Sequence, residues 1–233
     1  MTRSTGIAFC LILISLSVSA QRRIAADREV KTVFDGKVTT VRSEVFCQAS
    51  GEMVTVFQSP YPYYVLTNPS GEFKLYVPSS NEVYTDRRDD FSSKDDILYL
   101  FMTGKSGDMG LSGFGYRLSS TENEDGLLKR TYVPTVRGKG VSKVELVLEA
   151  YLPIYLAYYD EAGNVLSRTY LSAYSRYPRF ALPQRATTIT YTSRKDSVIV
   201  RTQYSRVRVD GDDPMFGFEV PADAKPTTLR PGR

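Results

Sequence analysis

The sequence predicts a mainly β protein built as an antiparallel sandwich or barrel, and three observations carry this prediction. From Val30 onward, apolar and polar residues alternate with a period of two, in runs rich in β-branched and aromatic residues. Clusters of Gly, Pro, Asn, Asp and Ser separate these runs, which predicts hairpins over 71–85 and 154–172. About ten or eleven such runs follow one another, at the spacing of antiparallel sheets.

The composition excludes several classes of protein. The chain has 233 residues, 42% of them hydrophobic, with 17 Tyr and 11 Phe, which suits one ordinary folded domain. It has no His and two Cys, which removes Ser-His-Asp and Cys-His catalysis and cysteine-rich zinc sites. Thirty basic against 26 acidic residues are too small an excess to favour nucleic acid. We expect no cofactor, no metal and no nucleic-acid partner.

The first twenty residues have the pattern of a secretory signal peptide. Arg3 precedes an apolar run over 7–16, and small residues follow up to Ala20. The alternative is a membrane anchor, but the run is about half of the roughly twenty residues that a spanning helix needs. We therefore expect residues 1–20 to be removed near Ala20 and Gln21, and the protein to be exported to the periplasm.

The remaining residues, 21–233, are predicted to form a single domain. They contain no fixed-period repeat, no low-complexity segment and no convincing linker. Cys47 is the cysteine that remains after cleavage, so no intramolecular disulfide is expected, and we interpret it as a buried, inert thiol. We expect a soluble monomer.

The alternation indicates which strand faces are apolar. Over 38–47, Val41 and Val45 fall on one face, whereas Arg42 and Glu44 fall on the other. Two further apolar sets follow the same rule: Phe73, Leu75 and Val77, and Val144, Leu146 and Leu148.

One segment, 92–104, is predicted to be helical. Ser92 or Ser93 can cap its start, and Gly104 stands just past its end. Between them lies a run that is apolar almost all round: Ile97, Leu98, Tyr99, Leu100, Phe101 and Met102. Such a helix is either part of the core or covers something apolar. The glycine-rich stretch that follows, with Met109 and Leu111, is expected to act as a hinge or a plain loop.

Candidate catalytic groups are few. Carboxylate pairs occur at Asp89-Asp90, Asp95-Asp96 and Asp212-Asp213, each among turn or helix-start residues. We interpret these pairs as solvated caps, and a glycan-hydrolysing enzyme is the less favoured alternative. No residue is predicted to be catalytic.

Four segments carry a resemblance to a known family. PYPYYVLTNPSGEFKLYVP (60–78) joins two aromatic strands through a Gly turn, and ILYLFMTG (97–104) is an apolar helix. A Tyr-rich strand lies within 153–183, and FGFEVP (216–221) has the form Phe-x-Phe-x-Val-Pro of a closing strand. In this order they resemble the periplasmic lipoprotein carriers of the LolA and LolB type.

The resemblance implies a half-open antiparallel β-barrel wrapped on a short helical lid, a mainly β (α+β) fold. It implies that 216–221 is a strand and that an arginine contacts the lid, with Arg42 as the nearest candidate. It further implies a carrier that holds the acyl chains of a lipid or lipoprotein in outer-membrane lipoprotein sorting or envelope lipid transport. A transport partner at the inner or outer membrane would load or unload it. The alternative is a non-catalytic interaction or structural domain of the envelope, with the same fold and no lipid.

The apolar faces and the helix then define the expected ligand-binding residues. They are Val41, Val45, Phe73, Leu75, Val77, Ile97, Leu98, Leu100, Phe101, Met109, Leu111, Val144, Leu146 and Leu148.

Overall fold

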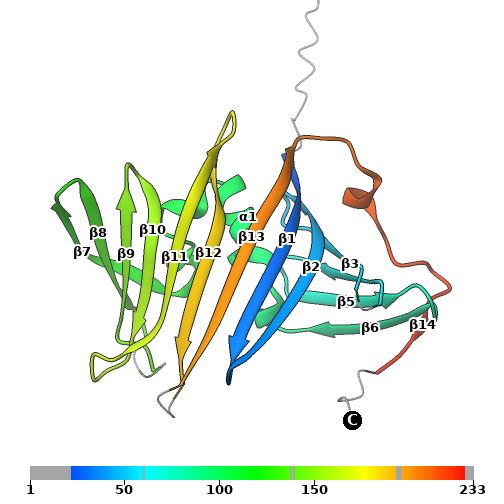
Figure 1. Cartoon of the computed structure of the whole chain (residues 1–233), viewed down its shortest axis with the longest axis horizontal. Coiled ribbons are helices and arrows are strands. Elements are labelled where there is room, and N and C mark those ends of the chain that lie inside the picture. Colours follow the sequence, from blue (N-terminus) through cyan, green and yellow to red (C-terminus); the bar gives the residue numbers. More distant parts are fainter. Residues whose placement is uncertain (1–21, 60, 137, 139, 193–195, 229–233) are drawn as a thin grey trace, which may run out of the picture.

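The computed structural model describes residues 22–228 apart from 60, 137, 139 and 193–195, and these residues form one open sheet of 14 strands (Figure 1). The predicted signal peptide, 1–20, lies outside the described residues. The mainly β class is confirmed, with 14 strands in place of ten or eleven. The strand order is β14-β6-β5-β4-β3-β2-β1-β13-β12-β11-β10-β9-β8-β7.

The chain builds one half of the sheet and then the other. The first half contains β1 (Arg23–Phe34), β2 (Lys37–Gln48), β3 (Met53–Phe57), β4 (Tyr63–Thr67), β5 (Glu72–Val77) and β6 (Glu82–Arg87). The second contains β7 (Tyr116–Glu124), β8 (Leu127–Pro134), β9 (Lys143–Glu149), β10 (Leu152–Tyr159), β11 (Val165–Arg176), β12 (Ala181–Tyr191) and β13 (Ser197–Val209). Pairing of β13 with β1 joins the halves, and the two predicted hairpins are confirmed as β5–β6 and β10–β11.

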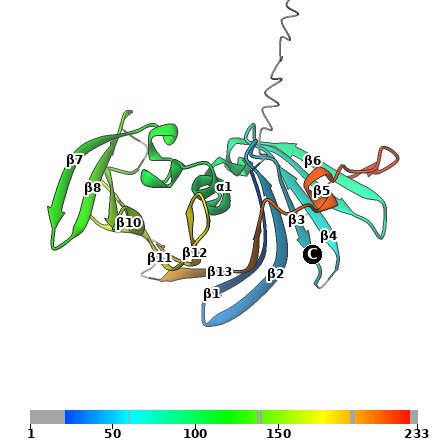
Figure 2. The same cartoon turned by 90° about the horizontal axis from the view of Figure 1, so that it is seen from above.

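A helical segment, residues 89–115, connects β6 to β7. It contains α1 (Ile97–Met102) and four short 3₁₀ turns: η1 (Asp89–Phe91), η2 (Ser93–Asp95), η3 (Lys105–Gly107) and η4 (Leu111–Phe114). Figure 2 shows the strands curving around this segment, so that the sheet has a concave face turned toward α1 and a convex face turned away from it.

The α-helix is shorter than predicted. Its N-cap is Asp96, whose Oδ1 accepts a hydrogen bond from the Leu98 N–H at 2.8 Å. Ser92 caps η2 instead, and the Ser93 hydroxyl donates to the Gly51 carbonyl. The residues before Asp96 therefore belong to separate turns because their polar groups bond to other parts of the chain.

The first strand begins at Arg23, well before the point where the alternation becomes clear in the sequence. The charges that obscure its pattern are paired across the sheet. Asp27 binds Arg206 of β13, and Glu29 accepts a hydrogen bond from Arg42 of β2 at 2.8 Å. Tertiary partners thus place a polar segment in the middle of the sheet.

The prediction of a closing strand at 216–221 is wrong. Residues 214–226, the C-terminal strap, form the 3₁₀ turn η5 (Pro214–Gly217), an extended crossing of the convex face and β14 (Lys225–Pro226), which pairs with β6 in parallel. Phe216 packs edge-on against Phe46 at 5.5 Å between ring centroids, and Phe218 lies 4.8 Å from Tyr64. The alternating aromatic residues therefore anchor a strap on the sheet and do not join a strand ladder.

Candidate functional site

The concavity of the sheet is occupied by α1. Five of its six residues are buried: Leu98, Tyr99, Leu100, Phe101 and Met102. They belong to one core cluster with Ile24 and Val45 from the first half of the sheet and Leu146 and Leu182 from the second half. Because α1 is apolar all round, both its flanks can be buried between the two halves of the curved sheet.

Past α1, the concave face continues as a surface of half-buried side chains. Val30 on β1 is paired directly with Val41 on β2 and Thr202 on β13, and it lies four residues beyond the buried Ala26 on the same face. We call this surface the open trough. Its members are Val30, Thr32, Val41, Val65, Leu75, Thr188, Val198 and Val200. In Figure 1, β1, β12 and β13 run on well past α1.

An ion pair links the sheet to the start of α1. An Arg28 guanidinium nitrogen lies 3.6 Å from Asp96 Oδ2, and both side chains are 18% exposed. Burial raises the pKa of the Asp96 carboxyl, and the charge of Arg28 opposes this effect. Burial also raises the pKa of the neighbouring Tyr204 hydroxyl. The arrangement fixes the N-terminus of α1 against β1 with groups that have little access to water.

This pair corrects the expectation for Arg42. Arg42 lies on the convex face and binds Glu29, so it points away from α1. The arginine that faces the helical segment is Arg28, which shares the concave face with Ala26 and Val30. Asp96, expected to be a solvated cap, is instead largely buried.

The second part of the helical segment covers the other half of the sheet. Arg130 on β8 donates a hydrogen bond to the Gly107 carbonyl at 2.9 Å, and Met109 and Leu111 are buried in the core cluster. Gly110 has φ +75°, and a Cβ built there would lie 3.1 Å from both Leu100 and Phe114. The glycine therefore allows η4 to pack closely against α1.

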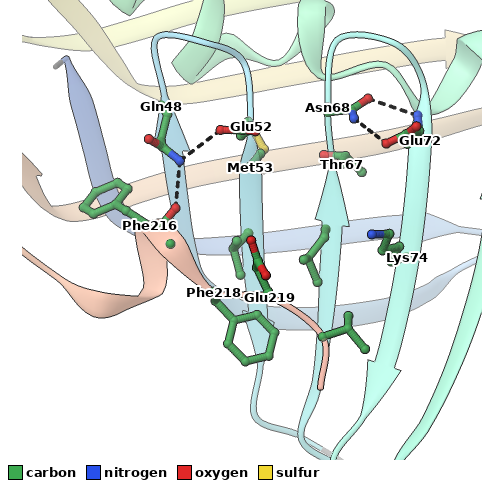
Figure 3. Close-up of a pocket in the computed structure, with 14 residues that line it drawn as sticks. Gln48, Glu52, Met53, Thr67, Asn68, Glu72, Lys74, Phe216, Phe218 and Glu219 are labelled. Atoms are coloured by element: carbon green, nitrogen blue, oxygen red, sulfur yellow. Dashed lines mark hydrogen bonds between the residues drawn. The ribbon is translucent and has the colours of Figure 1, made fainter. Parts of the chain in front are cut away.

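Two hollows adjoin these elements. One, of about 270 Å³, lies between α1 and η4, with Leu100, Gly110 and Phe114 among its walls. The other, of about 450 Å³, lies on the convex side under the C-terminal strap (Figure 3). There Gln48 donates a hydrogen bond to the Phe216 carbonyl at 2.7 Å, and Lys74 lies on the opposite wall. Both hollows are open to solvent.

The predicted ligand-binding residues divide into two groups. In the first group, Ile97 packs against the core cluster and the other nine residues are buried in it. These nine are Val45, Leu98, Leu100, Phe101, Met109, Leu111, Val144, Leu146 and Leu148. The other four are half-buried on the concave face of β2 and β5: Val41, Phe73, Leu75 and Val77.

The prediction from sequence missed most of the open trough and both members of the ion pair. Arg28 could have been found by extending the alternation of Val30 backward, since Ala26, Arg28 and Val30 share a period of two. The threonines of β12 gave no comparable signal, because both faces of that strand carry them, whereas on β13 the period-two recurrence of Val198, Val200 and Thr202 could have indicated the trough.

Within the described ranges, no three His, Cys, Asp or Glu side chains gather closely enough to hold a metal ion. In the same part of the chain, no helix has the length and apolar character needed to cross a membrane.

The fold and the site together define a class of protein: an open, curved antiparallel sheet that encloses an apolar helical segment on its concave face. Among solved structures, this chain is similar to a LolA superfamily protein from Nitrosomonas europaea (TM-score 0.53, 14% identity, 80% of this chain and 85% of that one). A domain assigned to outer-membrane lipoprotein sorting from Vibrio parahaemolyticus is also similar (0.53, 16%, 82% and 86%). So is a DUF1329 family protein from Desulfovibrio piger (0.54, 16%, 85% and 90%).

These likenesses show that the protein has a LolA-like fold, as the resemblance implied. No family model matches the sequence. The search of curated proteins found no match either.

Proposed function

We propose that this protein is a periplasmic carrier that holds the acyl chains of a lipid or lipoprotein on the concave face of its sheet. The observation that carries the proposal is the continuity of that face. The apolar helix α1 covers the part of this face that contains Ala26 and Val45, and the face continues past the helix into the open trough. An acyl chain in the trough would pack against the same concave face of the sheet as α1 does, next to the helix.

The energetics are consistent with reversible binding. Each methylene transferred from water to an apolar surface contributes about 0.8 kcal/mol. Opening the site further requires displacement of α1, whose buried side chains an acyl chain can replace. The ion pair between Arg28 and Asp96 sets part of the cost of that displacement. Cargo can be handed on because the closed state competes with the loaded one.

The remaining parts of the proposal follow from this role. We propose that residues 1–20 are a cleaved signal peptide, that residues 21–233 form one domain, and that the mature protein is a soluble monomer. A membrane partner would load or unload the cargo in outer-membrane lipoprotein sorting or envelope lipid transport. No catalytic step is part of the proposal.

Binding of a dansyl-labelled fatty acid tests the proposal. The variant Val30→Asn/Val200→Asn places amides in the open trough, whereas Val33→Asn/Ile199→Asn changes half-buried residues on the opposite face of the same two strands. We expect the trough variant to bind at least about tenfold more weakly than the wild type, since two apolar contacts are lost. The convex-face variant should bind normally. Equal binding by all three proteins, or none by the wild type, would contradict the proposal.

The second candidate is a non-catalytic interaction domain of the envelope without a lipid. It is favoured by the dense packing of α1, because five buried residues already fill the concavity around the helix. Failure of the wild type to bind the dansyl probe would favour this candidate.

A further inference from the structure

Three adjacent strands of the sheet contain no acidic residue. The strands β11, β12 and β13 together carry Arg168, Arg176, Arg185, Arg201, Arg206 and Arg208, and neither Asp nor Glu. In a chain with 30 basic and 26 acidic residues, this is a marked local separation of charge. A carrier of acyl chains does not require it, because the ligand surface lies on the concave face.

The strand register places three of these arginines on one patch of the convex face. Tyr170 is paired with Thr187, and Thr187 with Arg201, so these residues lie side by side across β11, β12 and β13. Arg168 and Arg185 are two residues away from Tyr170 and Thr187, and therefore point to the same side. The opposite side is occupied by the buried Leu171, Ala186 and Tyr204.

Tyrosines surround the arginines on this patch, which we call the arginine face (Arg168, Arg185, Arg201, Tyr155, Tyr170 and Tyr191). The Arg168 guanidinium carbon lies 5.1 Å from the centre of the Tyr191 ring. Tyr170 and Tyr191 are 41% and 38% exposed. Tyr155 extends the row onto β10, with its ring centre 5.3 Å from that of Tyr170.

The charges on the arginine face are not neutralised by the protein itself. Within the described part of the chain, Arg168, Arg185 and Arg201 have no carboxylate within 4.0 Å, and Arg168 Nε is enclosed without a hydrogen-bond partner. By contrast, Arg206 and Arg208 bind carboxylates of the first half of the sheet. The exposed guanidinium groups of Arg185 and Arg201 are thus available to an external anion, and Arg168 adds a positive charge beside them.

We propose that the arginine face is a docking surface for an anionic lipid bilayer. Guanidinium groups bind phosphate oxygens through paired hydrogen bonds, and clustered basic residues are drawn to negatively charged membranes. Exposed tyrosines favour the headgroup region, because each has an apolar ring and a polar hydroxyl. Docking through the convex face leaves the open trough uncovered, and it does not depend on whether the trough binds lipid.

Sedimentation with lipid vesicles tests this proposal. Vesicles of phosphatidylcholine, with and without phosphatidylglycerol, are mixed with the wild-type protein at low and high salt. We expect binding to the phosphatidylglycerol vesicles, weakened by salt, and little binding to phosphatidylcholine alone. The variant Arg168→Gln/Arg185→Gln/Arg201→Gln should lose about a hundredfold in affinity.

Two further variants keep the result interpretable. Arg185→Gln/Arg201→Gln changes exposed residues alone and should lose about twentyfold in affinity while remaining folded. Lys37→Gln/Arg87→Gln/Arg117→Gln removes three exposed charges elsewhere and should bind nearly as the wild type does.

The proposal is overturned if the wild type does not bind phosphatidylglycerol vesicles, or if the two triple variants lose affinity equally. Binding of soluble polyglutamate without binding of vesicles would also overturn it, and would assign the face to an acidic protein.

Discussion

Arg28 and Asp96 bring opposite charges together at the first turn of α1, 3.6 Å apart and mostly out of water. Taking both charges out of water costs free energy, which the attraction between them offsets. If one of the two were removed, the other would remain buried and uncompensated. Nearby, Cys47 is buried in the same cluster, and burial raises the pKa of its thiol. This keeps the thiol protonated and inert, as the sequence indicated.

Replacing one member of the pair should therefore have a large effect. We expect Arg28→Gln to lower the free energy of unfolding by about 3 kcal/mol, because it leaves the Asp96 carboxylate buried without a partner. Arg42→Gln is the matched control, since it removes an arginine from the neighbouring strand whose ion pair is exposed and contributes less than about 1 kcal/mol. Urea denaturation measures both. Equal effects of the two substitutions would show that Arg28 does not hold the helix.

The ionisation of Asp96 gives a pH dependence of known sign. Because burial raises its pKa above the ordinary value of 3.8, the native state binds a proton more readily than the unfolded state between the two pKa values. This contribution to stability is fully present below the unfolded pKa and is lost as the pH rises through the native pKa. Asp96→Asn lacks the titrating group but keeps a capping side chain.

We therefore expect the stability of the wild type, relative to Asp96→Asn, to rise as the pH falls from about 7 to about 4. Urea denaturation of both proteins at several pH values measures the difference, in which the contributions of other carboxylates cancel. A difference that stays constant or falls on acidification would contradict the assignment.

The helix α1 is too short to be stable without the sheet. Six residues make fewer than two turns, well below the roughly twelve to fifteen that an isolated helix needs. Its position depends on contacts with both halves of the sheet and on the turns that follow it, where Gly110 lets η4 approach Leu100. These contacts make the helical segment one packed unit with the concave face.

A substitution at Gly110 tests this packing. We expect Gly110→Ala to lower the free energy of unfolding by about 1–2 kcal/mol, because its positive φ disfavours a side chain and the new Cβ would press on Leu100 and Phe114. Gly113→Ala, whose Cβ meets nothing within 4 Å, should change stability by less than about 0.5 kcal/mol. Thermal unfolding monitored by circular dichroism compares the two. Similar losses for both would mean that the contact between η4 and α1 contributes little.

At the scale of the whole molecule, the strand faces could be predicted where apolar and polar residues alternate with a period of two. The apolar sets predicted on β2, β5 and β9 all lie on the concave face, as with Val144, Leu146 and Leu148, because each set repeats with a period of two. The start of β1 was missed because its charged residues find partners on two other strands, of which β13 is far away in the sequence.

The C-terminal segment shows a second reason for failure. Phe216 and Phe218 alternate as strand residues do, yet they pack on the convex face because Phe46, Tyr64 and Tyr76 present an aromatic surface there. Such a surface arises when several strands are assembled, so no local pattern in the sequence can predict it.

The proposed carrier function depends on whether the concave face holds acyl chains. Native mass spectrometry of the protein purified from the cell envelope measures this most directly. We predict a lipid adduct on the wild type and on Val33→Asn/Ile199→Asn, and loss of the adduct from Val30→Asn/Val200→Asn. A wild type that carries no lipid, or a trough variant that keeps it, would contradict the proposal that the concave face holds acyl chains.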